Sequence, residues 1–348
     1  MISNNKLNVA LVGTGYWGPN VARSLISTGK SSLVWLCDLN KKNLSKVSEL
    51  HPGTKTTNNL SDLLGDNTLD AIAISTPTKT HFNIAKQALE AGKHVLVEKP
   101  LADNLADSQE LTRIAAKKGL VLMVGHVFQY NAALMKLKEI INSGELGDIY
   151  YLSFVRTNLG PVRTDVNALW DLASHDVSIM CDLLGRSPDA VSATGSAFLN
   201  TGVEDVVFAT FKFTDGPQAN IHASWLNPKK VRQLTVIGSK KMAIWDDLDL
   251  RAPLTVIDKR VDVPSPGAVG DTYTDFKTIC VDGGVTIPKV PITQPLQEEC
   301  LHFLESIKNK TKPLTDGFNG ALIVNILESA NKSLRANGEY IACNSKVK

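Results

Sequence analysis

Long apolar runs and paired cysteines are both missing from this chain. No apolar stretch approaches the ~20 residues that a membrane-spanning helix needs. The opening segment, MISNNKLNVALVG, has too short an apolar part for a signal peptide. The five cysteines are odd in number and widely scattered, without a CxxC pair, so neither a disulfide framework nor a zinc knuckle is expected. We therefore predict a cytoplasmic protein.

An excess of charge of either sign is also missing. The chain has 37 lysines and arginines against 35 aspartates and glutamates, and no basic stripe suggests a nucleic-acid partner. No metal site is expected, because the adjacent His175 and Asp176 fall on different helix faces and no second metal-spaced pair accompanies them. With 348 residues, 43% of them hydrophobic, the chain is globular but too long for one ordinary core. Two domains are predicted, 1–125 and 126–348, and the last helices are candidates to pack back on the first domain.

What is present at the start is a strand, a glycine turn and a helix. LNVALVG at 7–13 is a short apolar run, GTGYWG follows at 13–18, and NVARSLISTG at 20–29 has helical spacing. The first glycine allows a tight turn, the second lets the backbone approach a pyrophosphate, and the third lets helix and strand pack closely. The helix N-terminus would offer N–H groups to the phosphates. The predicted cofactor-binding residues of this turn are Gly13, Gly15, Tyr16, Trp17 and Gly18.

The next apolar run, SLVWLCD at 32–38, ends in an acid. Asp38 lies 20 residues beyond Gly18, about the distance at which a dinucleotide site needs a carboxylate for the adenosine ribose hydroxyls. This favours NAD, because a carboxylate would repel the 2′-phosphate of NADP. Lys41 and Lys42 follow closely and keep NADP as the minor alternative.

Strand-like and helical segments alternate up to residue 125. The helical segments are 60–65, 81–92 and 104–118, and the strand-like segments are 69–76, 93–99 and 119–125. Repeated strand–helix units predict an α/β, Rossmann-type domain with a doubly wound parallel sheet. Ligands bind beyond the carboxyl ends of the strands in such sheets. The residues that fall at those ends are Thr76, Glu98, Lys99 and His126.

The pattern changes near residue 150. Short strand-like runs joined by turn residues predict an α+β domain with a large, mostly antiparallel open sheet: 149–160, 206–216, 218–226, 232–239 and 241–247. In VVFATFKF, at 206–213, both alternating sets of side chains are largely apolar, so one face can cover helices while the other needs a partner. We therefore predict a homodimer or homotetramer built on this sheet. Residues 261–290, rich in proline and glycine, are interpreted as a long excursion or lid.

One helix is predicted between these strands, over LWDLASHDVSIMCDLLG at 169–185. Apolar residues cover most of its circumference, which is typical of a buried helix. Its polar residues fall on one narrow stripe that should face an internal cleft: Asp171, His175, Ser178 and Asp182. A solvated stripe, or a helix start capped by Asp171, is the alternative.

These motifs together resemble the glucose–fructose oxidoreductase / inositol dehydrogenase / MocA (Gfo/Idh/MocA) family. The resemblance rests on GTGYWG at 13–18, STPTKTH at 75–81, VEKPLA at 97–102, GHVFQYN at 125–131, D-x-x-x-H at 171–175 and PLQEECLHFLESI at 295–307. It implies that Lys99, Asp171 and His175 are catalytic, that Glu98 lies near the nicotinamide ribose, and that the Lys99–Pro100 bond is cis. Many relatives have arginine at the position of Gln129. The cofactor-binding residues expected from these motifs add Thr76, Pro77, His81, Glu98, Lys99 and Gln129 to the glycine turn and Asp38.

The variant GYWGPN…WDLASHD resembles the branch of the family that acts on nucleotide-linked sugars. It implies NAD-dependent oxidation of carbon 3 of a UDP-N-acetylhexosamine or its uronic acid, in cell-surface polysaccharide biosynthesis. Arginine forks suit a diphosphate, although ordinary pairing with carboxylates is the alternative for Arg156 and Arg163. The substrate-binding candidates are Lys99, Arg156, Asn158, Arg163, Asn167, Asp171 and His175.

The expected reaction moves a hydride between a sugar carbon and the nicotinamide. Either His175, with an ordinary pKa of about 6.5, or Lys99, with a pKa lowered in a dry cleft, would accept the hydroxyl proton. Three alternative functions stay open at this point: a keto-deoxysugar-nucleotide reductase, a cyclitol dehydrogenase of the inositol type, and a dinucleotide-binding sensor that regulates partners.

Overall fold

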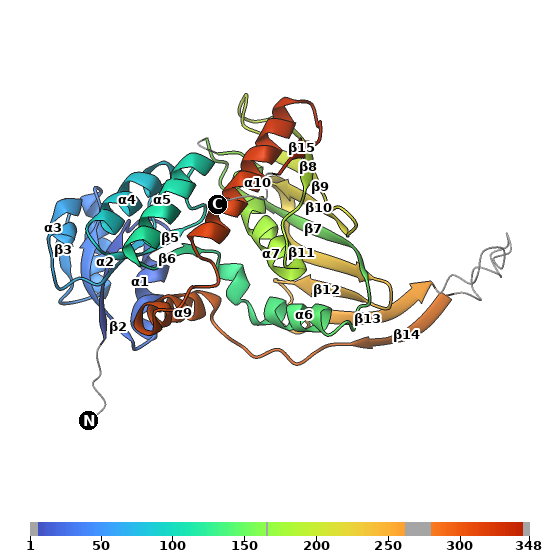
Figure 1. Cartoon of the computed structure of the whole chain (residues 1–348), viewed down its shortest axis with the longest axis horizontal. Helices are drawn as coiled ribbons and strands as arrows, with labels where there is room; N and C mark the ends of the chain where they lie inside the picture. The colour runs from blue at the N-terminus through green and yellow to red at the C-terminus, as the bar shows by residue number, and fades with distance from the viewer. Residues whose placement is uncertain (1–5, 165, 262–279, 344–348) are drawn as a thin grey trace. The chain divides into compact units, whose positions relative to one another are not determined.

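The computed structural model describes residues 6–164, 166–261 and 280–343 (Figure 1). The chain divides into two compact units, and each is described here by itself. The described residues of the first unit are 6–130 and 293–328, and those of the second are 131–292, with the gaps just given, and 329–343. The division falls close to the predicted boundary, and residues 293–328 return to the first unit, an arrangement considered for the last helices. No helix among the described residues is both long and apolar enough to cross a membrane.

A six-stranded, all-parallel sheet lies at the centre of the first unit, in the order β3-β2-β1-β4-β5-β6. Both faces of such a sheet are covered, which explains why β4 is buried at all four positions. The predicted doubly wound sheet is confirmed. The strands are β1 (Leu7–Val12), β2 (Ser31–Cys37), β3 (Lys55–Thr57), β4 (Ala71–Ile74), β5 (His94–Glu98) and β6 (Leu122–Gly125).

Helices alternate with these strands, and local chemistry sets their ends. Asn40 and Asn104 accept backbone N–H bonds as N-caps, and Gly119 ends a helix in the left-handed conformation at φ 63°. The helical segments of this unit are α1 (Gly18–Ser27), α2 (Lys41–Leu50), α3 (Leu60–Leu64), η1 (Thr78–Thr80), α4 (His81–Glu90), α5 (Leu105–Lys118), η2 (Val127–Tyr130) and α9 (Pro295–Asn309). A further helix, α10 (Gly317–Arg335), contains the point at which the chain passes to the second unit.

Helix α9 belongs to the core of the first unit although it comes late in the chain. It packs against α1 and η2. Its side chains Cys300, Phe303 and Leu304 are buried in one cluster with apolar residues of β1 and α1. The segment 295–307 thus brings Glu299 into the first unit.

A nine-stranded sheet forms the second unit, in the order β14-β13-β12-β11-β7-β10-β9-β8-β15. All pairings are antiparallel except that of β10 with β7. The predicted mostly antiparallel sheet is confirmed. The strands are β7 (Ile149–Leu159), β8 (Ala190–Ser196), β9 (Val206–Lys212), β10 (Gln218–Ser224), β11 (Leu226–Gly238), β12 (Met242–Asp246), β13 (Leu254–Val261), β14 (Cys280–Thr286) and β15 (Ile341–Ala342).

One face of this sheet is covered by helices α6 (Ala132–Asn142) and α7 (Ser174–Leu184), as Figure 1 shows. Helix α6 packs on β12 and β13, and the helical turn η3 (Leu169–Ala173) packs on β10. Because one face is covered, side chains along a strand alternate between buried and exposed. In β9, Val207, Ala209 and Phe211 are buried, whereas Phe208 on the opposite face is 53% exposed.

Two predictions for this unit need correction. The helix predicted over 169–185 is present but is not α-helical throughout, because residues 169–173 form a π-helical turn before α7 begins at Ser174. The excursion predicted over 261–290 includes a strand, β14, that pairs with β13. Residues 262–279 lie outside the described residues.

Candidate functional site

The glycine turn follows β1 and leads into α1. Gly13 has φ +95°, and a Cβ on it would lie 2.7 Å from the carbonyl carbon and oxygen of Ser75. A Cβ on Gly18 would lie 2.3 Å from the carbonyl oxygen of Gly13, so only glycine allows this approach of helix to turn. A Cβ on Gly15, in contrast, would meet no described atom within 4 Å. Space is therefore open beside the middle glycine, where a pyrophosphate needs it.

Asp38 follows β2 and turns one carboxylate oxygen to the glycine turn. The backbone N–H and the hydroxyl of Thr14 donate to Oδ2, at 2.6 and 2.8 Å, and the N–H of Asn40 donates to Oδ1 at 2.7 Å. Asp38, at the end of β2, thus stabilises the glycine turn through Thr14. Tyr16 is 96% exposed, and no side chain caps the N-terminus of α1.

The segment after β4 is held by a buried histidine. The two ring nitrogens of His81 each lie 2.8 Å from a carbonyl oxygen, Nδ1 from that of Pro100 and Nε2 from that of Thr76. His81 thereby ties the segment after β4, where Pro77 is exposed, to the segment after β5. The Lys99–Pro100 bond between them is cis, as the family resemblance implies.

Glu98 and Lys99 end β5 at the carboxyl edge of the sheet. The indole Nε1 of Trp17 donates to Glu98 Oε1 at 2.7 Å. Burial raises the pKa of Glu98 to about 7, against the opposing effects of this hydrogen bond and the Lys99 charge. Gly125 leaves room for this carboxylate, because a Cβ there would lie 3.1 Å from Glu98 Oε2.

Two further buried ionisable side chains belong to the first unit, His126 after β6 and Glu299 on α9. His126 is 2% exposed, neither of its ring nitrogens bonds to a described residue, and burial followed by the Lys99 charge lowers its pKa to about 3. Glu299 of α9 is 1% exposed, and burial followed by the Glu98 charge raises its pKa well above the ordinary value. His126 is thus neutral at pH 7, and burial disfavours the charged form of Glu299. Gln129, predicted to bind cofactor, is buried in η2.

The second unit holds Asp171 in the π-helical turn η3. Arg163 Nη1 lies 3.3 Å from Asp171 Oδ1, and the indole Nε1 of Trp225 donates to Oδ2 at 3.1 Å. Asn167 accepts from the backbone N–H of Trp170 at the start of this turn, and its side-chain amide donates to Glu204 at 2.8 Å. These contacts fix the turn before the chain enters α7.

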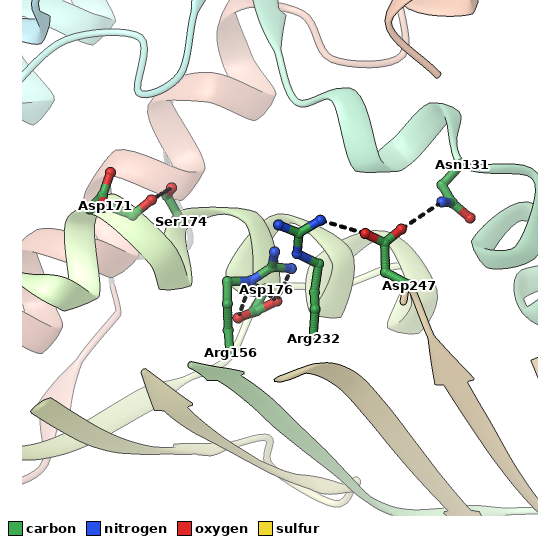
Figure 2. A network of polar contacts seen from close by, with 7 residues as sticks. All are labelled: Asn131, Arg156, Asp171, Ser174, Asp176, Arg232 and Asp247. Atoms are coloured by element: carbon green, nitrogen blue, oxygen red, sulfur yellow. Dashed lines mark hydrogen bonds and ion pairs between the residues drawn. The ribbon is translucent and has the colours of Figure 1, made fainter. Parts of the chain in front are cut away.

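Arg156 on β7 grips Asp176 on α7. Arg156 Nε lies 2.9 Å from both carboxylate oxygens and Nη2 lies 2.6 Å from Oδ1, with both side chains almost fully buried. Figure 2 shows that Arg232 of β11, which lies opposite Arg156 of β7, makes a single contact with Asp247, from Nη1 to Oδ2. Asp176 thus engages both Nε and Nη2 of Arg156.

The residues of the polar stripe predicted on 171–182 differ in burial and in their partners. His175 is partly exposed in the first turn of α7, Ser178 is buried, and Asp182 pairs with Lys138 of α6 at 2.6 Å. Asn158, a predicted substrate contact, is partly exposed near the end of β7. Asp171, His175 and Asp182 of the stripe are thus partly exposed, and Ser178 is buried.

Comparison with known proteins agrees with this geometry. A family model described as "Oxidoreductase family, NAD-binding Rossmann fold" matches residues 7–126, and one for the "GFO/IDH/MocA C-terminal domain" matches residues 134–244. The chain belongs to the Gfo/Idh/MocA oxidoreductase family. Its first unit is an NAD-binding Rossmann domain, and the open Gly15, the uncapped start of α1 and Asp38 fit that cofactor.

Relatives within the Gfo/Idh/MocA family differ in their substrates. UDP-N-acetylglucosamine 3-dehydrogenase of Acidithiobacillus ferrooxidans is 31% identical over 182 residues, which cover 52% of this chain and 56% of that protein. scyllo-Inositol 2-dehydrogenase (NAD(+)) of Bacillus subtilis is 25% identical and covers 95% of both chains. The matched stretches span 56% to 66% of the first three curated relatives.

The solved structure of UDP-N-acetylglucosamine 3-dehydrogenase GnnA from Acidithiobacillus ferrooxidans has the same fold. Its TM-score is 0.80 at 24% identity, and the match covers 95% of this chain and 98% of that one. At this level of identity, the similarity establishes the fold but does not identify the substrate.

Several contacts of the candidate site could not be predicted from the sequence. Trp17 and Glu98 are 81 positions apart, Trp225 and Asp171 are 54 apart, and Arg156 and Asp176 are 20 apart. No local spacing signals such pairs, because the strand order of each sheet creates them. For Glu299, the only sequence indication is that it lies in the family pattern PLQEECLHFLESI at 295–307.

Proposed function

We propose that this protein oxidises a secondary hydroxyl of a sugar with NAD, through Lys99, Asp171 and His175. The observation that supports the proposal most is the placement of Lys99. It follows Glu98 at the carboxyl end of β5, in a unit whose glycine turn and Asp38 fit a dinucleotide. Ligands of doubly wound sheets bind beyond these strand ends.

The chain's own residues would manage the proton and the developing charge. NAD, when bound, supplies the two-electron oxidant. His175 is the proposed base for the hydroxyl proton, because an imidazole accepts a proton near neutral pH. Lys99 is the proposed hydrogen-bond donor to the reacting oxygen, which stabilises alkoxide charge. Asp171, held by Arg163 and Trp225, would orient the substrate or the imidazole.

For the substrate we propose a UDP-N-acetylhexosamine or its uronic acid, oxidised at carbon 3. The 31% identity to a UDP-N-acetylglucosamine 3-dehydrogenase supports this choice. Among the predicted contacts, Arg163 is partly exposed and lies near Asn158 in sequence, so it is the better candidate for the diphosphate, while Arg156 is buried against Asp176. Cell-surface polysaccharide biosynthesis would then be the setting.

A cyclitol dehydrogenase is the second candidate. The relative that acts on scyllo-inositol matches 95% of the chain. The arginines Arg163 and Arg232 are both paired with aspartates, and such mixed pairs offer donors and acceptors that suit a neutral polyol.

A substrate panel distinguishes the candidates. The purified protein would be mixed with NAD and, separately, with UDP-N-acetylglucosamine, its uronic acid, UDP-glucose, dTDP-glucose or inositol, and the reduced-nicotinamide absorbance recorded. 2-Oxoglutarate would be added in parallel, since a tightly held cofactor that is recycled in place hides turnover. We expect a signal with one UDP-sugar that disappears in His175→Ala.

The other outcomes have defined meanings. A signal only with inositol keeps the reaction and discards the nucleotide sugar. Tight NAD binding with no turnover on any compound contradicts the proposed oxidation and favours a keto-sugar reductase or a dinucleotide sensor. NAD binding itself would be measured by titration of tryptophan fluorescence, independently of turnover.

We also propose that the open face of the nine-stranded sheet forms a homodimer or homotetramer contact. Exposed aromatic residues gather on its strands: Phe208 is 53% exposed and stacks on His222 with ring centroids 4.5 Å apart, and Tyr151 is 43% exposed. Apolar surface of this kind favours burial against a second copy.

A further inference from the structure

The two predicted catalytic side chains of the second unit lie on either side of a change in helix type. Asp171 is in the π-helical turn Leu169–Ala173, and His175 is in the first turn of α7, which starts at Ser174. A π-helical turn holds more residues than an α-helical turn, is rare, and frequently occurs at functional sites. The relative direction of Asp171 and His175 therefore depends on how this junction is held, since one continuous α-helix would orient them differently.

The π-helical side of the junction is held through Asp171 itself. Its two carboxylate oxygens contact Arg163 at 3.3 Å and Trp225 at 3.1 Å. Trp225 is 1% exposed, and its backbone N–H donates to the carbonyl oxygen of Asp205 at 3.0 Å. A fixed indole thus sets the position of one carboxylate oxygen.

The α-helical side is held by the residue after His175. Asp176 receives three hydrogen bonds from Arg156, at 2.9, 2.9 and 2.6 Å, which tie the first turn of α7 to β7. Arg232 on β11 lies opposite Arg156 on β7 and donates a hydrogen bond to Asp247. Asn131 also donates to Asp247, at 3.3 Å (Figure 2). The planar fork of an arginine fixes direction as well as distance.

A buried ion pair of this kind is not needed for stability alone. Replacing such a pair with apolar residues of similar volume is often neutral or stabilising, because desolvation offsets the attraction between the charges. What an apolar pair lacks is a fixed mutual orientation. The Arg156–Asp176 pair is thus best suited to orientation.

We propose that Arg156 and Asp176 are positioning residues, which hold the π-to-α junction so that His175 and Asp171 keep one relative arrangement. This rests on the proposed function, since His175 is a base only in that reaction. Displacing a catalytic group by about 1 Å costs roughly 100-fold in rate. The effect should therefore fall on kcat far more than on KM.

The main test removes both charges at once, by Arg156→Met with Asp176→Leu. The matched control is Lys138→Met with Asp182→Leu, which removes another ion pair from the same helix at its far end. We expect both double variants to fold, and only the first to lower kcat, by about 10- to 100-fold with KM nearly unchanged. A crystal structure of the first should show the π-helical turn altered or His175 displaced.

A second variant, Arg156→Lys, keeps the charge but loses the fork. It should fold with wild-type thermal stability and lose part of kcat. Unchanged kcat in both Arg156 variants, or an unchanged junction in the crystal structure, would overturn the proposal. Unfolding of the double variant would also overturn it, because the pair would then serve stability. The crystallographic comparison needs no turnover, so it stands even where the proposed oxidation fails.

Discussion

At the scale of single residues, the proposed function depends most on Lys99, which follows Glu98 at the end of β5. Replacing it with Ala removes the proposed donor to the reacting oxygen while the glycine turn and Asp38 remain. We expect kcat to fall by about 100- to 1,000-fold, the range seen when a donor to a developing oxyanion is lost. NAD affinity, measured by fluorescence titration, should change little.

Lys117→Ala is the control for this prediction, since Lys117 is exposed on α5. Its kcat should equal that of the wild type. Near-normal turnover in Lys99→Ala would remove Lys99 from the mechanism.

Glu98 makes a pH-dependent contribution to stability. Its pKa rises from 4.5 in the unfolded chain to about 7 in the folded one, mainly through burial. The folded state therefore binds the proton more tightly, so this contribution is present below pH 4.5 and is lost as the pH rises through 7. A difference of this size corresponds to at most about 3 kcal/mol.

Glu98→Gln, which stays neutral at every pH, should not show that loss. The difference in melting temperature between Glu98→Gln and the wild type should grow from pH 5 to pH 8 in thermal unfolding. Glu298→Gln, at an exposed position of α9, is the control and should give a constant difference. A constant difference for Glu98→Gln as well would show that the carboxyl is not buried enough to shift its pKa.

At the scale of elements, two glycines of the turn between β1 and α1 are expected to have different roles, Gly18 in packing and Gly15 in NAD binding. A Cβ at position 18 would collide with the Gly13 carbonyl oxygen at 2.3 Å, whereas one at position 15 would meet no described atom within 4 Å. Gly18→Ala should thus lower the melting temperature by several degrees, since overpacking costs about 1–3 kcal/mol. Gly15→Ala should keep the melting temperature and weaken NAD binding.

Isothermal titration with NAD, paired with thermal unfolding, measures both effects. Equal losses of NAD affinity and stability in the two variants would contradict this division. Unaltered NAD affinity in Gly15→Ala would show that the pyrophosphate does not approach that glycine.

At the scale of the whole molecule, the open sheet face predicts association. Phe208→Glu places a charge among the aromatic residues of that face, and burial of an unpaired charge is strongly unfavourable. We expect light scattering to report a homodimer or homotetramer for the wild type and a smaller species for Phe208→Glu. Leu250→Glu, at a residue that is 92% exposed in the turn after β12, should keep the wild-type mass. A wild-type monomer would contradict the proposal.

The sequence by itself determined the two sheets and the positions of the site segments along the chain. Apolar runs of four to eight residues, glycine turns and helical spacing are local signals, and each depends on residues a few positions apart. Gly13, Gly18 and Asp38 could be assigned in this way, because strand, turn and acid have a fixed spacing. The same signals placed Glu98 and Lys99 at the end of a buried strand.

Only the tertiary structure decided which side chains meet. The pairs Trp17–Glu98, Arg156–Asp176 and Trp225–Asp171 each join elements that the sheet order brings together. The π-helical turn at Leu169–Ala173 likewise escaped the sequence, because residues 169–185 fit a continuous helical period. A helical period records which faces are apolar, whereas the contacts that hold a π-helical turn come from strands far away in the chain.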